Sequence, residues 1–169
     1  MIMAFSTFDA SVPVFRQMLG SLSALLEKAD AHAKANCMDV NELLEARLAP
    51  DMFTFTRQIQ IACDHAKGCV ARLAGVELPK FDDTEKTVAE LQERIRKTLE
   101  FVNSVSPEQF AGAEDRDITL VFPWATYDFK GSRYLTYWAL PNFFFHATTA
   151  YDLLRHKGVP IGKADFLGN

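Results

Sequence analysis

The sequence predicts an all-α protein, a bundle of four amphipathic helices with a short extra helix and a small β-hairpin before the last helix. Two observations predict this fold. Apolar side chains recur at helical spacing in four long segments, and the period becomes strand-like only in one short stretch after Gly112. The 169 residues contain no internal repeat and no change of composition, so we expect one helical domain over residues 1–169.

The first long helix is predicted from Ser11 to Asn36. Ser11 is the expected cap, and Pro13 is tolerated because the first turn has no partner for its missing N–H. Asp39 and Glu42 fit a capping box that opens a short helix over Val40–Leu48. The stripe that the long helix should bury contains Phe15, Met18, Leu19, Leu22, Leu25, Leu26 and Ala29.

The second long helix is predicted from Phe53 to Ala74, after Asp51 and before Gly75. Its expected core stripe is Phe55, Ile59, Ala62, Ala66, Cys69, Val70 and Leu73, and the small members should allow a close neighbour. The third helix is predicted over Glu85–Val102, capped by Asp82, Asp83 or Thr84. Its solvent face should carry the pairs Glu90–Arg94, Glu93–Lys97 and Arg96–Glu100.

Shorter elements follow. Ser106–Gln109 reads as a capped turn, and Arg116–Phe122 with Ala125–Lys130 reads as a hairpin that must pack on the helices. The last helical region should span Ser132–His156, with a kink or break at Pro141. The tail after Gly158 carries Ile161, Phe166 and Leu167, which need a surface on which to dock.

Composition limits the partners. With 22 acidic and 18 basic residues and no Lys/Arg block, the chain is not expected to bind nucleic acid. The apolar-rich stretch from Tyr134 to Ala150 is interrupted by Pro141 and polar residues, so no membrane span is expected. The first fifteen residues lack a positively charged leader, and Cys37, Cys63 and Cys69 are odd in number. We expect a cytoplasmic protein whose three thiols act as small core side chains.

The candidate chemistry is concentrated in two histidines. The chain has no phosphate loop, CxxC, HExxH or GxSxG motif, which excludes the enzymes built on them. His65 lies at the edge of the second helix's stripe. His146 shares a flank of the last helix with Asn142 and Thr149. Histidines on facing helices can bind one zinc or nickel ion, although such sites normally have three strong donors.

The alternative is that both are core histidines satisfied by hydrogen bonds. For His146 the expected partners are Tyr151, Thr149 or a backbone carbonyl. His32 and His156 lie near helix ends and are expected to be solvated.

A dense aromatic cluster surrounds the start of the last helix. It can wall a ligand pocket or form a dimer surface, and core packing is the favoured interpretation. Because three consecutive phenylalanines point in three directions around a helix, at least one must contact something outside the central core. The cluster comprises Trp124, Tyr127, Phe129, Tyr134, Tyr137, Trp138, Phe143, Phe144 and Phe145.

Three long strings carry a family resemblance over essentially the whole chain. They are VPVFRQMLGSLSALLEKADAHA, LLEARLAPDMFTFTRQIQIACDHAKGCVARLAG and LPNFFFHATTAYDLLRHKGVPIGKADFLG. They resemble a bacterial domain-of-unknown-function family grouped with the DinB/YfiT-like superfamily. The resemblance implies an up-down-down-up four-helix bundle, frequent homodimers and, in many members, a three-histidine metal site with thiol-dependent transferase or isomerase activity.

The resemblance also locates the metal site. Its pattern takes one histidine from the second helix and an HxxxH pair from the last. Here His146 matches the second member of that pair, and Asn142 replaces the first. The second helix offers His65 or its neighbour Asp64, and His65 is preferred because Asp64 falls on the solvent side of a helical wheel. No catalytic residue is identified. The sequence therefore leaves two hypotheses: a divalent-metal and small-molecule pocket at His65, His146 and Asn142, or a non-catalytic dimeric bundle that binds partners.

Overall fold

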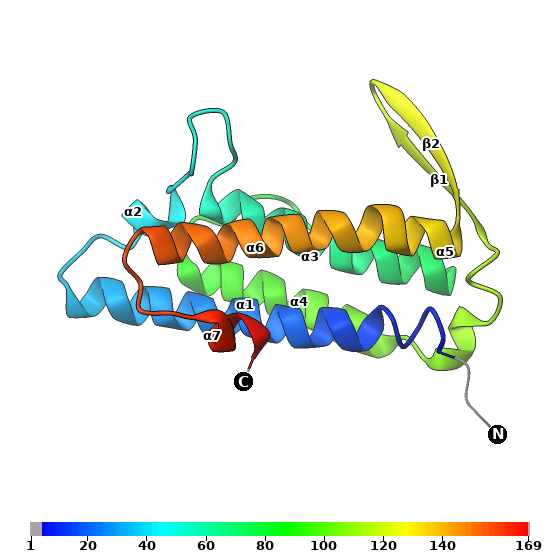
Figure 1. The fold of residues 1–169 in the computed structure, drawn as a ribbon, viewed down its shortest axis with the longest axis horizontal. Helices are drawn as coiled ribbons and strands as arrows, with labels where there is room; N and C mark the ends of the chain where they lie inside the picture. Colours follow the sequence, from blue (N-terminus) through cyan, green and yellow to red (C-terminus); the bar gives the residue numbers. More distant parts are fainter. Residues whose placement is uncertain (1–4, 169) are drawn as a thin grey trace.

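The computed structural model describes residues 5–168 and confirms the four-helix bundle (Figure 1). Residues 1–4 and 169 lie outside the described part. The expectation of no leader segment concerns the first fifteen residues, so it falls partly on residues that the structure does not describe. The main helices are α1 (Val12–Ala35), α3 (Phe55–Ala74), α4 (Val88–Ser104) and α6 (Leu140–His156). The short elements are α2 (Asn41–Leu44), η1 (Pro107–Phe110), β1 (Asp117–Phe122), β2 (Ala125–Lys130), α5 (Gly131–Tyr134), η2 (Leu135–Ala139) and α7 (Lys163–Leu167).

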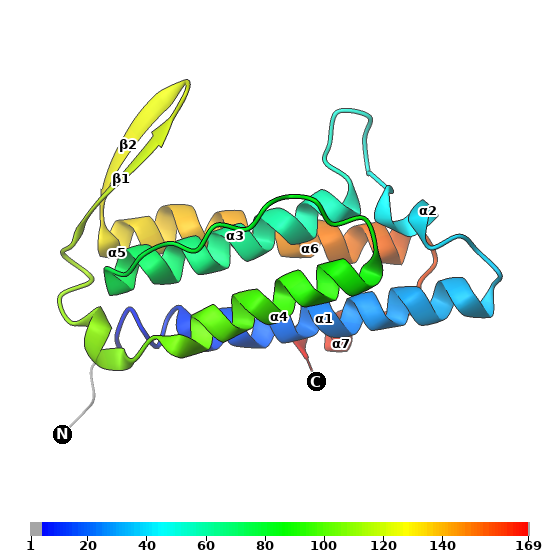
Figure 2. The same ribbon diagram turned by 180° about the vertical axis from the view of Figure 1, so that it is seen from behind.

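Helices α3 and α4 run in the same direction, opposite to α1 and α6, as the family resemblance implies (Figure 2). A parallel pair cannot be joined by a short turn. The connector, residues 75–87, therefore leaves the end of α3 and runs back along that helix to the start of α4 (Figure 2). Gly75 begins this reversal in the left-handed conformation, with φ of 68°, as the sequence predicts.

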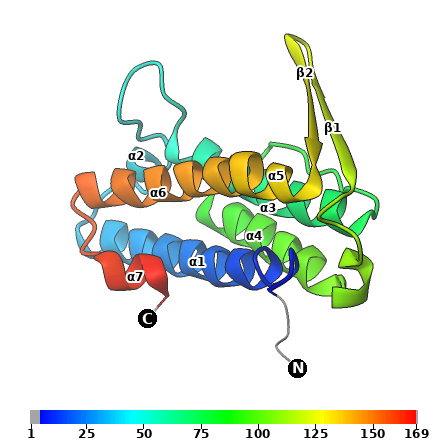
Figure 3. The same cartoon turned by 45° about the vertical axis from the view of Figure 1, so that its right-hand side comes forward.

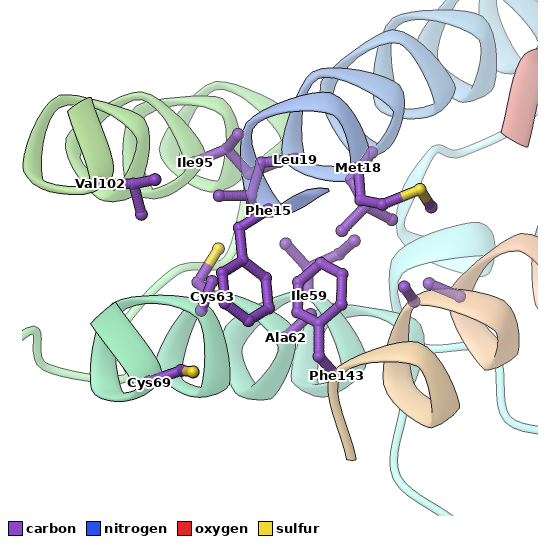
Figure 4. Close-up of a cluster of buried hydrophobic side chains, with 14 of the residues drawn as sticks. Phe15, Met18, Leu19, Ile59, Ala62, Cys63, Cys69, Ile95, Val102 and Phe143 are labelled. Carbon is purple, nitrogen blue, oxygen red and sulfur yellow. The ribbon is translucent and has the colours of Figure 1, made fainter. Parts of the chain in front are cut away.

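The predicted stripes of α1 and α3 are buried in full and meet in one core. Phe15 from α1 and Phe143 from α6 pack edge to face, with ring centroids 4.9 Å apart, above Ile59 and Ala62 of α3 (Figure 4). The small side chains of α3 thus lie beneath the bulky ones of its neighbours. This packing places α3 next to α6, where both candidate histidines are located.

Several predicted helix boundaries were wrong because another cap is used. Helix α3 begins at Phe55 after Thr54, whose hydroxyl accepts a hydrogen bond from the Arg57 N–H. Helix α4 begins at Val88, and Thr87 forms a full capping box with Glu90. The predicted caps of α4, residues 82–84, belong to the connector instead.

The first two predicted caps also differ. The Ser11 hydroxyl donates to the carbonyl of Thr7, 2.6 Å away, instead of capping α1. Asp39 accepts from the Asn41 N–H in a local turn, so α2 covers four residues and not the predicted Val40–Leu48. The predicted turn at Ser106 is confirmed as η1, with the Gln109 side chain accepting from the Ser106 N–H.

The last helical region changes its hydrogen-bonding pattern just before the predicted Pro141. Segment η2 has π-helical geometry, and α6 starts beside Pro141. The Leu140 N–H reaches back to the carbonyl of Leu135, five residues earlier. Because Pro141 has no N–H to donate, the wider turn allows the chain to continue as α6 without a break.

The hairpin is also confirmed: β1 and β2 pair antiparallel from Asp117 with Lys130 to Phe122 with Ala125. One face of the hairpin packs on the helices as expected, since Ile118 and Leu120 are buried and the rings of Phe122 and Trp138 lie 5.8 Å apart. The strands also extend beyond the helices (Figure 3). The tail docks as expected, because α7 lies on α1 and Phe166 packs against Tyr151. No helix within residues 5–168 is long and apolar enough to cross a membrane.

Two of the three cysteines are core side chains, and the third is not. Cys63 and Cys69 are buried, and burial raises the pKa of the Cys63 thiol to about 12. Cys37 is exposed at the end of α1 with φ of 51°. There the Met38 N–H donates a hydrogen bond to the carbonyl of Ala33, which ends the helix. Cys37 thus occupies the left-handed position after the helix that usually carries glycine.

The connector is held to the bundle by a buried arginine. Arg94 of α4 is 1% exposed and contacts Asp64 of α3 at 2.9 Å, and Asp83 and Glu85 of the connector at 2.9 and 3.0 Å. Arg94 was predicted to pair with Glu90 on the solvent face, and that prediction is wrong. Partners distant in the sequence surround Arg94 instead, and Glu90 caps α4.

We expect Arg94→Met to lower the free energy of unfolding by about 3 kcal/mol, because it leaves a cluster of carboxylates without its buried cation. Chemical denaturation measures this change. The matched control is Arg96→Met, two residues along the same helix, whose exposed ion pairs with Glu93 and Glu100 should contribute little. Equal effects of the two substitutions would contradict the role assigned to Arg94.

Candidate functional site

Helix α3 presents a line of three polar residues to α6 and to the segment before it. Gln58, His65 and Arg72 follow each other at intervals of seven residues, two helical turns, so they share one face. Each contacts the last helical region: Gln58 and His65 meet His146, and Arg72 meets Tyr134. These contacts join α3 to α5 and α6 through polar groups beside the apolar core.

The two candidate histidines lie together. The rings of His65 and His146 have centroids 5.7 Å apart and planes 15° from parallel. His146 is 9% exposed, and its Nδ1–H donates to Oε1 of Gln58 across 2.6 Å. This bond fixes the tautomer, and the unprotonated Nε2 keeps a lone pair.

Both imidazoles are neutral at pH 7. Burial lowers the pKa of His146 to about 4, and the nearby charge of Arg57 acts in the same direction. Burial also lowers the pKa of His65 to about 4, assisted by the proximity of His146. Neutral imidazole is the form that binds metal ions or accepts a proton.

Asn142, the third predicted ligand, is directed elsewhere. Its side-chain amide donates to the carbonyl of Trp138, 2.8 Å away in its own helical segment. Within residues 5–168 no three His, Cys, Asp or Glu side chains are grouped so that they could hold a metal ion. The structure therefore brings His65 and His146 together, and a role for Asn142 as a ligand stays a prediction.

The neighbouring polar residues have partners of their own. Thr149 donates to the carbonyl of Phe145, so it is not the partner of His146. Asp64, although partly exposed, contacts Lys67 and Arg94 at 3.0 and 2.9 Å. The hydrogen-bond partner expected for a core histidine is present, but it is Gln58 and neither Thr149 nor Tyr151.

A cavity of about 270 Å³ opens beside His65. It lies where α3, the connector, the hairpin and η2 meet, and its lining combines His65 and Arg72 with apolar side chains such as Leu120 and Trp138. A larger groove of about 1000 Å³ runs between α1 and α4, but it touches none of the three predicted ligands. Of the three predicted ligands, the smaller cavity is lined by His65, and His146 lies next to His65 outside that lining.

Core packing was the favoured interpretation of the aromatic cluster, and it is wrong for part of the cluster. Tyr134 and Phe143 are buried, but Trp124 is 75% exposed and Phe145 is 57% exposed. The projecting hairpin carries Trp124 beyond the helices, and Phe145 points away from the core as one of the three phenylalanines must. The remaining exposed members are Tyr127 and Tyr137, and the partly buried ones are Phe129, Trp138 and Phe144.

Gln58 and Arg72 were not identified from the sequence. Both lie seven residues from His65, so a search for polar residues on the same face of α3 would have found them. Tyr134 was assigned only to the aromatic cluster, although its hydroxyl accepts from Arg72. Their partners belong to the last helical region, and helical spacing within α3 does not reveal them.

Acid should destabilise the metal-free fold through these histidines. The unfolded chain binds protons near pH 6.5, and the folded imidazoles bind them only near pH 4, so stability falls as the pH decreases across that window. For His146 we expect a loss of about 2 kcal/mol between pH 7 and pH 5. Urea unfolding in EDTA at each pH measures it.

The variant His146→Gln should lose less stability than the wild type over the same interval. The control is His156→Gln, at the exposed end of α6, which should follow the wild type. A wild-type loss no greater than that of His146→Gln would show that His146 is not held neutral by burial.

Comparisons with known proteins agree with this architecture. Residues 7–167 match the model of DUF1993, a domain of unknown function. The crystal structure of a DinB family member protein from Shewanella denitrificans is 44% identical, and the match covers 96% of this chain and 92% of that one with a TM-score of 0.89. No curated protein matches the chain. The chain therefore belongs to the DUF1993 family and has the DinB-like fold.

Proposed function

We propose that this DinB-like protein binds a divalent metal ion, such as zinc or nickel, and a small molecule between α3 and α6. The observation that carries the proposal is the pair of neutral, adjacent imidazoles of His65 and His146. Their positions on two packed helices are held by the core and by Gln58. The neighbouring cavity supplies space for a small ligand.

The distance between the two rings supports an ion with two protein ligands, and one of the stacked rings, whose planes are 15° from parallel, would turn so that both lone pairs meet at the ion. An ion about 2 Å from one nitrogen of each ring holds the ring centres roughly 5–6 Å apart, and these centres are 5.7 Å apart. A histidine that binds a metal through one ring nitrogen normally donates a hydrogen bond from the other, and Gln58 accepts such a bond from Nδ1 of His146. Because three strong donors are usual, we expect weak binding that leaves positions free for an external ligand.

A divalent ion in this place would act as a Lewis acid or lower the pKa of a bound water or thiol. The protein's own contribution is to keep both imidazoles neutral and oriented and to exclude water from His146, which is nearly buried. Thiol-dependent group transfer is the activity that we attach to this site, in line with the sequence resemblance. No side chain is assigned a catalytic role.

Metal affinity tests the proposal. Metal-free protein without a purification tag is titrated with Zn²⁺ and Ni²⁺ by calorimetry and competition with a chromophoric chelator. We expect one weak site, weakened at least tenfold by His65→Ala or His146→Ala, because each substitution removes one of two ligands. The control His32→Ala removes a histidine of α1 outside the site and should leave the affinity unchanged.

The variant Asn142→His provides the converse test, because it would add a third imidazole one turn before His146. We expect the affinity to rise by about 100-fold or more, with a matching rise in melting temperature at fixed metal. Absence of binding in the wild type together with no gain in Asn142→His would refute the metal site. Binding that survives both alanine substitutions would place the ion elsewhere.

A second candidate function is a dimeric interaction module. Exposed apolar side chains on the hairpin, η2 and α6 support it, among them Val121, Trp124, Tyr137 and Phe145. Such side chains usually find a partner surface when they lie near one another. A homodimer is the partner that the sequence resemblance implies.

Sedimentation equilibrium at micromolar concentration tests the second candidate. We expect a wild-type dimer that Phe145→Glu converts to a monomer, because a buried carboxylate would be unpaired in the interface. The control is Leu48→Glu, an exposed apolar residue in the loop before α3. A monomeric wild type would refute this candidate without affecting the metal site.

A further inference from the structure

Arg72 occupies an unusual position beside the cavity. Its Nη1 donates to the hydroxyl of Tyr134 at 3.1 Å, and its guanidinium carbon lies 5.9 Å from the centre of that ring. Gly68 lies one turn earlier on α3, and a β-carbon there would stand 2.5 Å from Nη1. The guanidinium therefore lies close to the α3 backbone at Gly68 on one side and beside the ring of Tyr134 on the other.

The charge of Arg72 is not neutralised by the protein. Among residues 5–168 no carboxylate comes within ion-pair distance of it. The other cation that lines the cavity, Lys67, contacts Asp64 at 3.0 Å. Tyr134 supplies no charge either, because burial raises the pKa of its phenol well above the ordinary value. A half-buried guanidinium with unused donors is thus left facing the cavity.

The remainder of the lining is suited to an apolar body. Leu78 of the connector, Leu120 and Phe122 of β1, and Trp138 of η2 surround the space. His65 and Asp64 border it on α3, and the Asp64 carboxylate is paired with Lys67 and Arg94. Its volume of about 270 Å³ lies just below the range of drug-sized pockets, roughly 300–1000 Å³. A ligand that fills it has room for about one ring.

We propose that this cavity binds a small monocarboxylate with an aromatic or branched apolar body, held by Arg72 through its carboxylate. The planar guanidinium matches a carboxylate with two parallel hydrogen bonds, and Tyr134 on one side of Arg72 fixes its orientation. The inference deepens the proposed function, because His65 borders the same cavity and the bound molecule would lie next to the proposed metal ligand.

Benzoate is the probe, and metal-free protein in EDTA is the sample, so that binding through Arg72 is measured apart from any metal. The chain has two tryptophans, and the indole N–H signal of Trp138 reports on the cavity by NMR. We expect benzoate to shift this signal in a saturable manner. The larger shift should be at Trp138 and the smaller at Trp124, on the exposed hairpin turn. Benzamide, which has the same ring without the charge, should bind at least tenfold more weakly.

Substitutions of Arg72 test whether this residue binds the carboxylate of benzoate. We expect Arg72→Gln to weaken benzoate binding at least tenfold and Arg72→Lys to weaken it less, since lysine keeps the charge without the planar fork. The matched control is Arg133→Gln, an exposed arginine stacked 4.6 Å from the ring of Tyr137 outside the cavity, and it should bind as the wild type does. Urea unfolding of each variant confirms that it is folded.

Three results would overturn the proposal. These are equal benzoate affinity in the wild type and Arg72→Gln, equal binding of benzamide and benzoate, or benzoate binding that requires added Zn²⁺ and disappears in His146→Ala. The last result would place the carboxylate on the metal and leave the proposed metal site intact. Conversely, benzoate binding in EDTA with no metal binding in any variant would support this inference and refute only the metal site.

Discussion

The hydrogen bond between Gln58 and His146 is the interaction on which the arrangement of the site depends. A buried imidazole must have a partner, and here the partner lies on the helix against which α6 packs. The bond therefore does three things together: it satisfies His146, fixes its tautomer and helps to set the register of α6 on α3. The ring of His65 then lies against that of His146. Without Gln58, His146 would lose the hydrogen bond that fixes its tautomer.

A second constraint comes from the parallel course of α3 and α4. The connector must return along the bundle, and its polar backbone and carboxylates need partners there. Arg94, lying beside the ring of Phe81 and in contact with carboxylates from α3 and the connector, supplies the charge. The same connector contributes Leu78 to the cavity wall. The ionic cluster that completes the fold thus also positions one wall of the candidate ligand site.

Much of the fold could be predicted from the sequence because the relevant information is local. The stripes of α1 and α3, the glycine that ends α3, the irregular turn before Pro141 and the hairpin each depend on residues within a few turns of one another. Helix caps were less predictable, since several adjacent residues could serve: α3 begins after Thr54 and not after Asp51, and α4 is capped by Thr87 and not by residues 82–84. Cys37 was misassigned because the helix-ending conformation leaves it exposed.

The candidate site was only partly predictable. His65 and His146 were identified, and they do lie together, but Gln58 and Arg72 were missed because their partners are distant in the sequence. Arg94 shows the same difficulty: its spacing from Glu90 suits an ion pair on a helix surface, but tertiary partners bury it. Helical spacing shows which residues share a face, and it does not show what that face meets.

The most direct test of the account is the protonation state of the two histidines in metal-free protein, measured by long-range ¹H–¹⁵N NMR of the imidazole rings. We expect both rings to be neutral from pH 7 to pH 5, and we expect His146 to carry its proton on Nδ1, with Nε2 free. Addition of Zn²⁺ should then shift the free nitrogens. A protonated pair at pH 6, or a proton on Nε2 of His146, would contradict the assigned hydrogen bond with Gln58 and the site built on it.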